Sequence, residues 1–599
     1  MVSLTASATP AQVGYVVRAL DLHAHVFEVT LAIAQPATDQ LVSLPVWIPG
    51  SYLLREFAKH LQGLHARQGN KPVAMTQRDK CSWQIHTKAG KALVLSYQVY
   101  AFDSSVRTAW LDSRRGFFNG TSLCLRVHGQ EDTPHQLTLL NDDLPKDWQA
   151  ATALRAQRIS KRGFGDYLAA NYDELVDSPV ELGPFWRGEF VAADIKHHFI
   201  VSGAPDSFDG ARLLADTQAI CEAEISFWHG KQPQQAPQRH YLFMLNAVHD
   251  GYGGLEHRHS TALICKRADL PRLGQTRSGA PSDGYTTLLG LISHEYFHTW
   301  NVKRLRPLEF ARYDYARENY TELLWFFEGF TSYFDDLLLR RAGRIDTAHY
   351  LKLLAKTINQ VLQTPGRQLQ SVAQSSFDAW VKYYRQDENT ANATVSYYTK
   401  GALVALCLDL SLRHAGKTSL DAVMRELWQR CQGGPMTQDD LLAVLADLSG
   451  KSYGAELQQW VHGTADLPIK KLLKQHGIRL DEERAPLPDQ LGIKVNEQQG
   501  IRLKSVLRGS AAEQAGFAAG DEWLGVATGQ GQSTQRWRLN KLDDLATYLG
   551  SDTHCRALVA RDQRLLTLSL DVPDTACSVK LGVIDLKQVD TWLDGKIPA

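Results

Sequence analysis

The 599-residue sequence has few cysteines and no cysteine pair with metal-binding spacing. Its eight cysteines are scattered along the chain, and none forms a C-x-x-C motif. They are Cys81, Cys124, Cys221, Cys265, Cys407, Cys431, Cys555 and Cys577. This pattern argues against a disulfide framework and against a zinc site built from cysteines.

The chain also lacks net charge and long apolar runs. It has 65 Lys+Arg against 65 Asp+Glu, so no long-range field favours nucleic acid or an anionic membrane as partner. No apolar run approaches the roughly 18 residues that span a bilayer. The start, MVSLTASATPAQVGYVV, lacks the basic and continuously apolar segments of a signal peptide. We therefore predict a cytoplasmic protein without a membrane span; a periplasmic or secreted protein whose leader has been removed is the alternative.

Apolar and aromatic residues are plentiful. They make up 44% of the chain, with 14 Trp, 21 Tyr and 20 Phe, which is enough to form several cores and excludes a largely disordered chain. At roughly 150 residues per domain, the length suggests about four domains, or three if one is large.

The sequence pattern changes along the chain and predicts a multidomain α+β protein. Residues 1–170 alternate apolar and polar positions between turn residues, which is typical of a β-rich domain. Residues 171–475 contain helical periods, several ending at Gly, and predict a mainly helical domain. A charged, Pro-containing linker is expected at 476–490, a smaller β-rich unit at 491–575 and an ordered tail at 576–599.

The strongest local signal is HEYFH, which contains His294, Glu295 and His298 within a predicted helix. Four residues apart, both imidazoles lie on one helix face and can bind one Zn²⁺, with Glu295 beside a water on the metal. The alternative is two ordinary surface or core histidines.

A catalytic zinc needs a third protein ligand and an open position. Glu309, Glu318, Glu322 and Glu328 are the downstream candidates. Glu328 lies in the apolar stretch LLWFFEGFTSYF, where an ionised carboxylate is costly unless it binds a cation or a strong donor. This favours Glu328, although a partly exposed helix residue remains the alternative.

These motifs carry a family resemblance. HEYFHTWN and WFFEGF resemble the zinc-binding motifs of aminopeptidase N-type gluzincins. The longer gap between them and the run HTWNVKRLRP instead resemble the related glycyl aminopeptidase family, as do PVWIPGSYLLREFAKH, VRTAWLD, GFFNGTS and GGLEHRHS. The resemblance implies an N-terminal β domain, a thermolysin-like mainly helical zinc peptidase domain and a C-terminal PDZ domain.

The resemblance also implies roles for individual residues. His294, His298 and Glu328 would bind one Zn²⁺ per chain, and Glu295 would act as general base. In GGLEH, Gly253, Gly254 and Glu256 take the place of the family's substrate-binding motif, in which the glutamate pairs with the free α-ammonium of a peptide. Leu255 and His257 depart from that motif, and a plain turn or edge strand is the alternative.

Tyr398, in YYTKG, matches the tyrosine that stabilises the developing oxyanion in the family. Adjacent Tyr397 is the competing assignment. Ser332 and Asp335 follow Glu328 along the helix and are candidates for orienting the ligands.

The basic cluster Lys303, Arg304 and Arg306 precedes Pro307. We interpret these residues as cations at the C-terminal end of the zinc-motif helix, in preference to a site for a substrate carboxylate.

The unit at 491–575 contains GSAAEQAGFAAGDEWLGV, which resembles bacterial PDZ domains. Leu491, Gly492 and Ile493 would then form the loop that receives a peptide C-terminus, beside a strand edge open to β-augmentation. Gln490 replaces the usual first glycine of that loop. A structural domain that binds nothing is the alternative.

The resulting hypothesis is a zinc aminopeptidase that removes N-terminal residues from peptides, with Gly and Ala favoured by family likeness. An endopeptidase with PDZ-assisted substrate capture is the second hypothesis. A non-catalytic peptide-binding scaffold with structural zinc is the third, but Glu295 argues against it because a structural site needs no carboxylate beside the metal.

Overall fold

The computed structural model describes residues 12–596 except 89, 276–280, 530 and 574–577. Residues 1–11 of the expected N-terminal segment, Cys577 and parts of the predicted 576–599 tail therefore lie outside the described residues. The chain forms two compact units. The first comprises Met1–Tyr320, Arg341–Ile345 and Trp428–Met436, and the second comprises Thr321–Arg340, Asp346–Leu427 and Thr437–Ala599.

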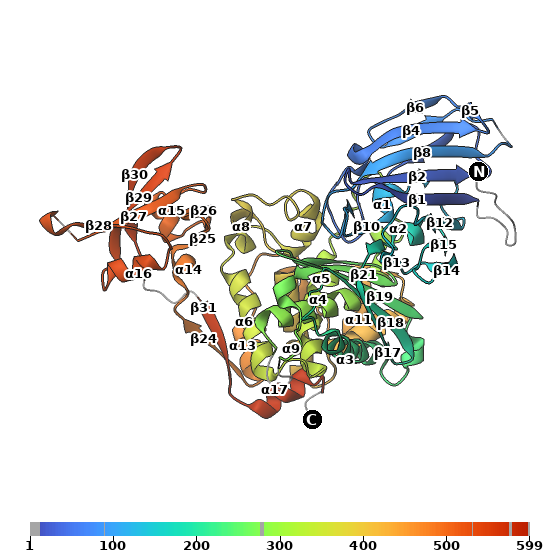
Figure 1. Ribbon diagram of the computed structural model, residues 1–599. Helices are drawn as coiled ribbons and strands as arrows, with labels where there is room; N and C mark the ends of the chain where they lie inside the picture. Colours follow the sequence, from blue (N-terminus) through green and yellow to red (C-terminus); the bar gives the residue numbers. More distant parts are fainter. Residues whose placement is uncertain (1–11, 89, 276–280, 530, 574–577, 597–599) are drawn as a thin grey trace. The chain divides into compact units, whose positions relative to one another are not determined.

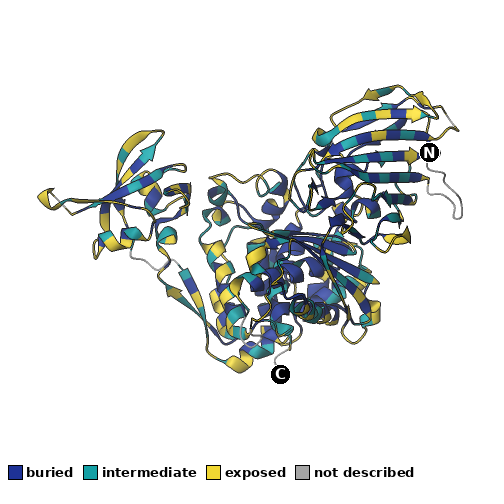
Figure 2. Ribbon diagram, in the orientation of Figure 1, coloured by how far each residue is buried: buried dark blue, intermediate teal, exposed yellow. Residues whose placement is uncertain are grey.

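The first unit begins with an eight-stranded sheet built from alternating sequences (Figure 1). Val13, Tyr15 and Val17 of the first strand are buried, whereas the residues between them are partly exposed, and the strands are correspondingly striped in Figure 2. In spatial order the strands are β14 (Arg155–Ile159), β15 (Gly165–Ala169), β12 (His135–Leu139), β1 (Val13–Asp21), β2 (Val26–Ile33), β8 (Leu93–Tyr100), β4 (Leu61–Gln68) and β5 (Lys71–Pro72).

Two four-stranded sheets share one apolar core with this sheet, which makes the N-terminal domain β-sandwich-like. One has the order β13 (Gln149–Thr152), β16 (Val180–Gly183), β10 (Gly116–Phe118) and β9 (Ala109–Leu111). The other has the order β11 (Arg126–Val127), β3 (Gln40–Ser43), β7 (Ser82–Ile85) and β6 (Met75–Gln77). Two short helices, α1 (Gly120–Leu123) and α2 (Tyr172–Val176), accompany them.

A five-stranded sheet follows in the same unit. Its order is β17 (Trp186–Ala192), β18 (Ile195–Ser202), β19 (His240–Val248), β21 (Ser260–Lys266) and β20 (Gly253–Glu256). The central strand β19 reads HYLFMLNAV, a nearly continuous apolar run, because its neighbours pair with it in parallel and both its faces are buried. The last strand, β20, pairs antiparallel with β21 and lies at the edge of the sheet.

Two long helices of this unit pack against the sheet. Helix α3 (Gly210–His229) packs on β17 and on α4 (Asp283–Phe297), and α4 also contacts β20 and β21. The Ser282 side chain caps α4 by accepting a hydrogen bond from the Tyr285 N–H. This packing places the HEYFH segment beside the edge strand.

The helices of the second unit agree with the helical periods in the later part of 171–475, whereas strands within residues 186–266 of that range form the five-stranded sheet, so that part is not mainly helical as expected. The helices are α5 (Leu324–Arg341), α6 (Thr347–Leu362), α7 (Val372–Phe377), α8 (Thr390–Ala393), α9 (Thr399–His414), α10 (Leu420–Arg430), α11 (Gln438–Ser449), α12 (Gly454–Trp460) and α13 (Ile469–Gln475). Helix α9 is buried on nearly all sides, in agreement with its apolar sequence.

The segment expected as a linker at 476–490 contains regular structure. Strand β24 (Ile478–Glu483) pairs antiparallel with β31 (Ser578–Val583), and helix α17 (Leu586–Leu593) follows. Trp592 anchors α17, since its indole N–H donates to the Asp409 carboxylate at 3.1 Å. The chain thus returns after the C-terminal module and ties both ends of that module to the helices of the second unit.

The C-terminal module has its own apolar core and a six-stranded sheet. Its strands are β25 (Ile493–Asn496), β26 (Ile501–Val506), β27 (Glu522–Thr528), β28 (Gln535–Arg538), β29 (His554–Arg561) and β30 (Arg564–Asp571). Its helices are α14 (Leu487–Leu491), α15 (Ala511–Ala515) and α16 (Asp544–Leu549).

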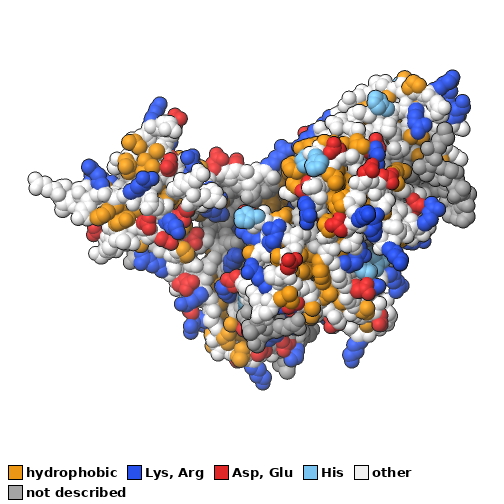
Figure 3. Space-filling model, viewed as in Figure 1, with side chains coloured by type: hydrophobic (Ala, Val, Ile, Leu, Met, Phe, Trp, Pro, Cys, Tyr) orange, Lys and Arg blue, Asp and Glu red, His pale blue; other side chains and the backbone are white. Residues whose placement is uncertain are grey.

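Among the described residues, no helix combines the length and the apolar character needed to cross a membrane. On the face seen in Figure 3, basic and acidic side chains are interspersed, in keeping with the balanced composition.

Candidate functional site

The two histidines of HEYFH lie at the C-terminal end of α4. His294 is in its last turn and His298 is its C-cap, so both side chains project from the same end of the helix. Their Nε2 atoms are 3.1 Å apart, close to the roughly 3.3 Å expected for two nitrogens that each lie about 2.0 Å from one tetrahedral zinc. The pair is therefore directed at a single point.

The backbone fixes the ring of His298. Its Nδ1–H donates to the Asn301 carbonyl at 2.8 Å, which leaves the Nε2 lone pair for a cation.

Trp300 is completely buried, and its indole N–H donates to His229 Nε2 at 2.8 Å. Burial lowers the pKa of His229 to about 4, so that imidazole is neutral and can accept this bond.

Glu328 supplies the third potential ligand. It lies in the first turns of α5 and is 2% exposed. One ligand atom from each of His294, His298 and Glu328 lies within 4.8 Å of the others. Two imidazole nitrogens and one carboxylate oxygen form a donor set that suits Zn²⁺ and leaves a fourth position for a reactant. The residues present thus fit the expected metal.

Glu295 follows His294 and is 4% exposed. Its carboxylate lies directly against Gly254 of the edge strand, where an added Cβ would come within 2.1 Å of Oε1. Only glycine permits so close an approach of β20 to Glu295. The strand backbone and the carboxylate next to the histidines therefore line the same small space.

Glu256, at the end of β20, is 5% exposed and lies against a loop of the N-terminal domain. A Cβ on Gly50 would come within 2.5 Å of the Glu256 carboxylate. Gly50 also has φ +91°, in the left-handed region that favours glycine. Glu256 is thus held between the edge strand and the N-terminal domain, and the motif PVWIPGSY supplies one wall.

The basic cluster does not cap the zinc-motif helix, so our interpretation of Lys303, Arg304 and Arg306 is wrong. Helix α4 ends at Phe297, and the chain then turns. Lys303 is 3% exposed and donates to Asp177 at 2.7 Å. The Asp177 carboxylate therefore compensates the charge of Lys303, and the C-terminal end of α4 does not.

Asp177 was not apparent as a site residue in the sequence. It follows α2 and binds Lys303, the His257 ring at 3.0 Å and the Arg258 N–H at 3.0 Å. Burial would raise the pKa of Asp177, but Lys303 and His257 outweigh it and hold the pKa well below its ordinary value. The Asp177 carboxylate thus links His257, which follows Glu256, to Lys303 in the loop after His298. Its partners lie far away in the sequence, and no local motif reveals it.

Tyr398 precedes α9, as predicted, and its ring stacks on Tyr383 and Tyr397, while Tyr384 meets Tyr383 edge-on. The hydroxyls of Tyr398 and Tyr384 are 3.3 Å apart. Burial, and then the nearby Glu328 carboxylate, raises the pKa of Tyr398 well above its ordinary value. Its hydroxyl therefore stays protonated at neutral pH and can donate a hydrogen bond.

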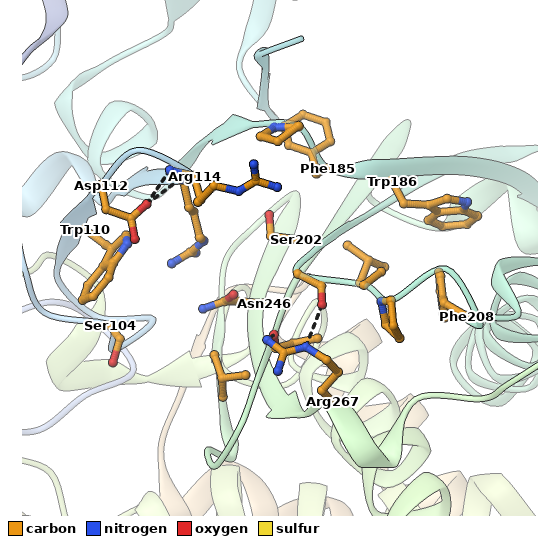
Figure 4. A pocket seen from close by; sticks show the side chains of 18 of the residues that line it. Ser104, Trp110, Asp112, Arg114, Phe185, Trp186, Ser202, Phe208, Asn246 and Arg267 are labelled. Carbon is orange, nitrogen blue, oxygen red and sulfur yellow. Dashed lines mark hydrogen bonds between the residues drawn. The ribbon is translucent and has the colours of Figure 1, made fainter. Parts of the chain in front are cut away.

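A separate cavity of about 640 Å³ lies where the N-terminal domain meets strands β18 and β19 (Figure 4). Aromatic side chains, including Trp110, Trp186 and Phe208, line it together with Arg114 and Arg267. Arg267 donates to two backbone carbonyls and so serves the fold. None of the histidines or carboxylates described above lines this cavity.

Comparisons with known proteins agree with this architecture. Residues 14–184 match the Peptidase M61 N-terminal domain, and residues 287–404 match the M61 glycyl aminopeptidase family. No curated protein sequence matches the chain. The crystal structure of an aminopeptidase N family protein from Idiomarina loihiensis is similar over 97% of this chain and 100% of that chain, with 37% identity and a TM-score of 0.90.

A weaker likeness links the chain to a mutant M1 zinc metallopeptidase from Deinococcus radiodurans, bound to a Tyr-Ser-Ala substrate. It covers 76% of this chain and 95% of that chain, with 15% identity and a TM-score of 0.48.

Proposed function

Because the chain belongs to the M61 glycyl aminopeptidase family and is therefore a peptidase, we propose that it is a zinc-dependent aminopeptidase that removes N-terminal residues from peptides. The observation that carries this proposal is the convergence of the His294, His298 and Glu328 ligand atoms. Glu295 lies against Gly254 of the edge strand, and Glu256 follows Gly254 by two residues on the same strand. Family membership supports Gly and Ala as preferred N-terminal residues.

His294, His298 and Glu328 would hold one Zn²⁺ per chain. When bound, Zn²⁺ supplies Lewis acidity that polarises a scissile carbonyl and makes water reactive near neutral pH. Glu295 would take the proton of the attacking water on its carboxylate and deliver it to the leaving amine. Its position against the Gly254 backbone supports this role, because a peptide paired with β20 would present its carbonyl beside Glu295.

Glu256 would select substrates with a free N-terminus. The buried Glu256 carboxylate has no ion pair with a cation in the described part of the chain, so it would pair favourably with a substrate α-ammonium. Gly253 and Gly254 offer backbone without side chains for the peptide to approach. Tyr398 would donate its hydroxyl to the oxyanion that forms on the scissile carbonyl.

We expect Gly50→Ala to lower kcat/KM for peptides with a free N-terminus by about 10-fold to 100-fold, because the added methyl group displaces the Glu256 carboxylate. The matched control is Gly63→Ala. Gly63 also has positive φ, at +62°, but nothing lies within 4 Å of its Cβ position. Both variants should lose about 1 kcal/mol of stability from backbone strain. Equal activity of the two variants would contradict the placement of Glu256 in the site.

The experiment that tests the function compares one peptide amide in free and N-acetylated form. We expect cleavage of the first residue from the free peptide and at least about 100-fold slower cleavage of the acetylated one, since acetylation removes the charge that pairs with Glu256. Equal cleavage of both would favour an endopeptidase. Zinc binding without cleavage of either would favour a peptide-binding scaffold.

The C-terminal module is proposed to be PDZ-like. Support comes from strand β25 at the edge of its sheet and from the left-handed Gly492, with φ +69°, directly before it. A peptide C-terminus would then add to the β25 edge near Leu491, Gly492 and Ile493.

A further inference from the structure

Arg107 reaches the edge strand from the N-terminal domain. It belongs to the segment VRTAWLD, and its Nη2–H donates to the Gly254 carbonyl at 2.9 Å. Its Nη1 would lie 3.8 Å from a Cβ on Gly253. The guanidinium therefore lies beside Gly254 and Gly253 of β20, on the N-terminal side of Glu256 along the strand.

The ladder pattern shows which side of β20 Arg107 occupies. The His257 N–H donates to the Ser260 carbonyl at 2.9 Å, so His257, Leu255 and Gly253 turn their backbone groups toward β21. Gly254 and Glu256 alternate with them and turn theirs toward the free edge. Arg107 thus lies on the edge along which a peptide substrate would add as a further strand.

The charge of Arg107 is available for a ligand. Among the described residues, no carboxylate forms an ion pair with it, and the only hydrogen bond of its side chain to protein is the one to Gly254. Its Nε–H is shielded from solvent and has no acceptor within the described part of the chain. A guanidinium with free donors matches the two oxygens of a carboxylate.

The spacing along β20 gives the length of the ligand. Gly254 and Gly253 lie two and three residues before Glu256, which corresponds to about 7 and 10 Å along a strand. These are also the lengths of an extended dipeptide and tripeptide. We propose that Arg107 binds the C-terminal carboxylate of short peptides whose α-ammonium is held by Glu256, and that free di- and tripeptides are the preferred substrates. This proposal rests on the function proposed above.

The test measures kcat and KM for trialanine and for trialanine amide, which differ only in the C-terminal charge. We expect the wild-type protein to prefer the free acid by about 10-fold to 100-fold through a lower KM. Arg107→Gln should abolish this preference by raising KM for the acid while kcat changes little, and Arg107→Lys should restore part of it because it keeps the charge.

The matched control is Arg114→Gln, which removes an exposed arginine two residues after the VRTAWLD segment, at the cavity of Figure 4. It should retain the wild-type preference, which excludes a general effect of net charge. If Arg107→Gln impairs acid and amide equally, Arg107 only supports β20 and the proposal is wrong. A wild-type protein that cleaves both substrates without preference also refutes it, whereas cleavage of neither refutes the proposed aminopeptidase function itself.

Discussion

Glu295→Gln is expected to lower kcat for a good peptide substrate by about 10³-fold while zinc stays bound. The amide has the same shape as the carboxylate but cannot take up the proton of the attacking water. Because Glu295 is not one of the three clustered ligands, the metal site should remain intact. The measurement pairs steady-state kinetics with zinc content determined on the same sample.

Glu318→Gln is the control for this experiment. It makes the same chemical change in the polar stretch RYDYARENYTE, outside the His/His/Glu cluster, and should leave kcat within about 2-fold of wild type. Near-normal turnover of Glu295→Gln would exclude Glu295 as the general base.

Glu328→Ala is expected to abolish both stoichiometric zinc binding and activity. Two histidines alone do not complete the three-ligand set of a catalytic zinc site. The substitution shortens a buried side chain, so we expect the protein to keep its helical content without bound metal. Zinc content after dialysis and circular dichroism together separate metal loss from unfolding.

Glu318→Ala is again the comparison, because Glu318 was one of the alternative ligands considered from the sequence. It should retain one zinc per chain. If Glu318→Ala loses zinc and Glu328→Ala keeps it, the ligand set is wrong.

The residues close together in sequence were the predictable part of the site. HEYFH places two imidazoles on one helix face by periodicity alone, and the cost of a carboxylate within LLWFFEGFTSYF pointed to Glu328. The structure brings these three side chains together. The alternating N-terminal strands and the helical periods of the second unit were likewise predictable, because local burial patterns determine them.

Contacts between distant segments could not be predicted in this way. Gly50, Arg107 and Asp177 all lie in the N-terminal part of the chain, yet they contact Glu256, Gly254 and Lys303. Their local sequences carry no signal for these partners. Lys303 illustrates the resulting error, since a basic residue after a helix suggests a helix cap until its buried partner Asp177 is known. The 476–490 segment is similar, because its strand β24 pairs with β31, about a hundred residues later.

The central claim is that a zinc site and a free-amine pocket act on the same substrate. The most direct measurement follows hydrolysis of a free and an N-acetylated alanyl peptide amide by protein with about one zinc per chain, before and after chelation. We predict rapid cleavage of the free peptide alone, loss of that activity with the metal and recovery when zinc is restored. Cleavage that persists after chelation, or equal cleavage of the free and the N-acetylated peptide, would contradict the account.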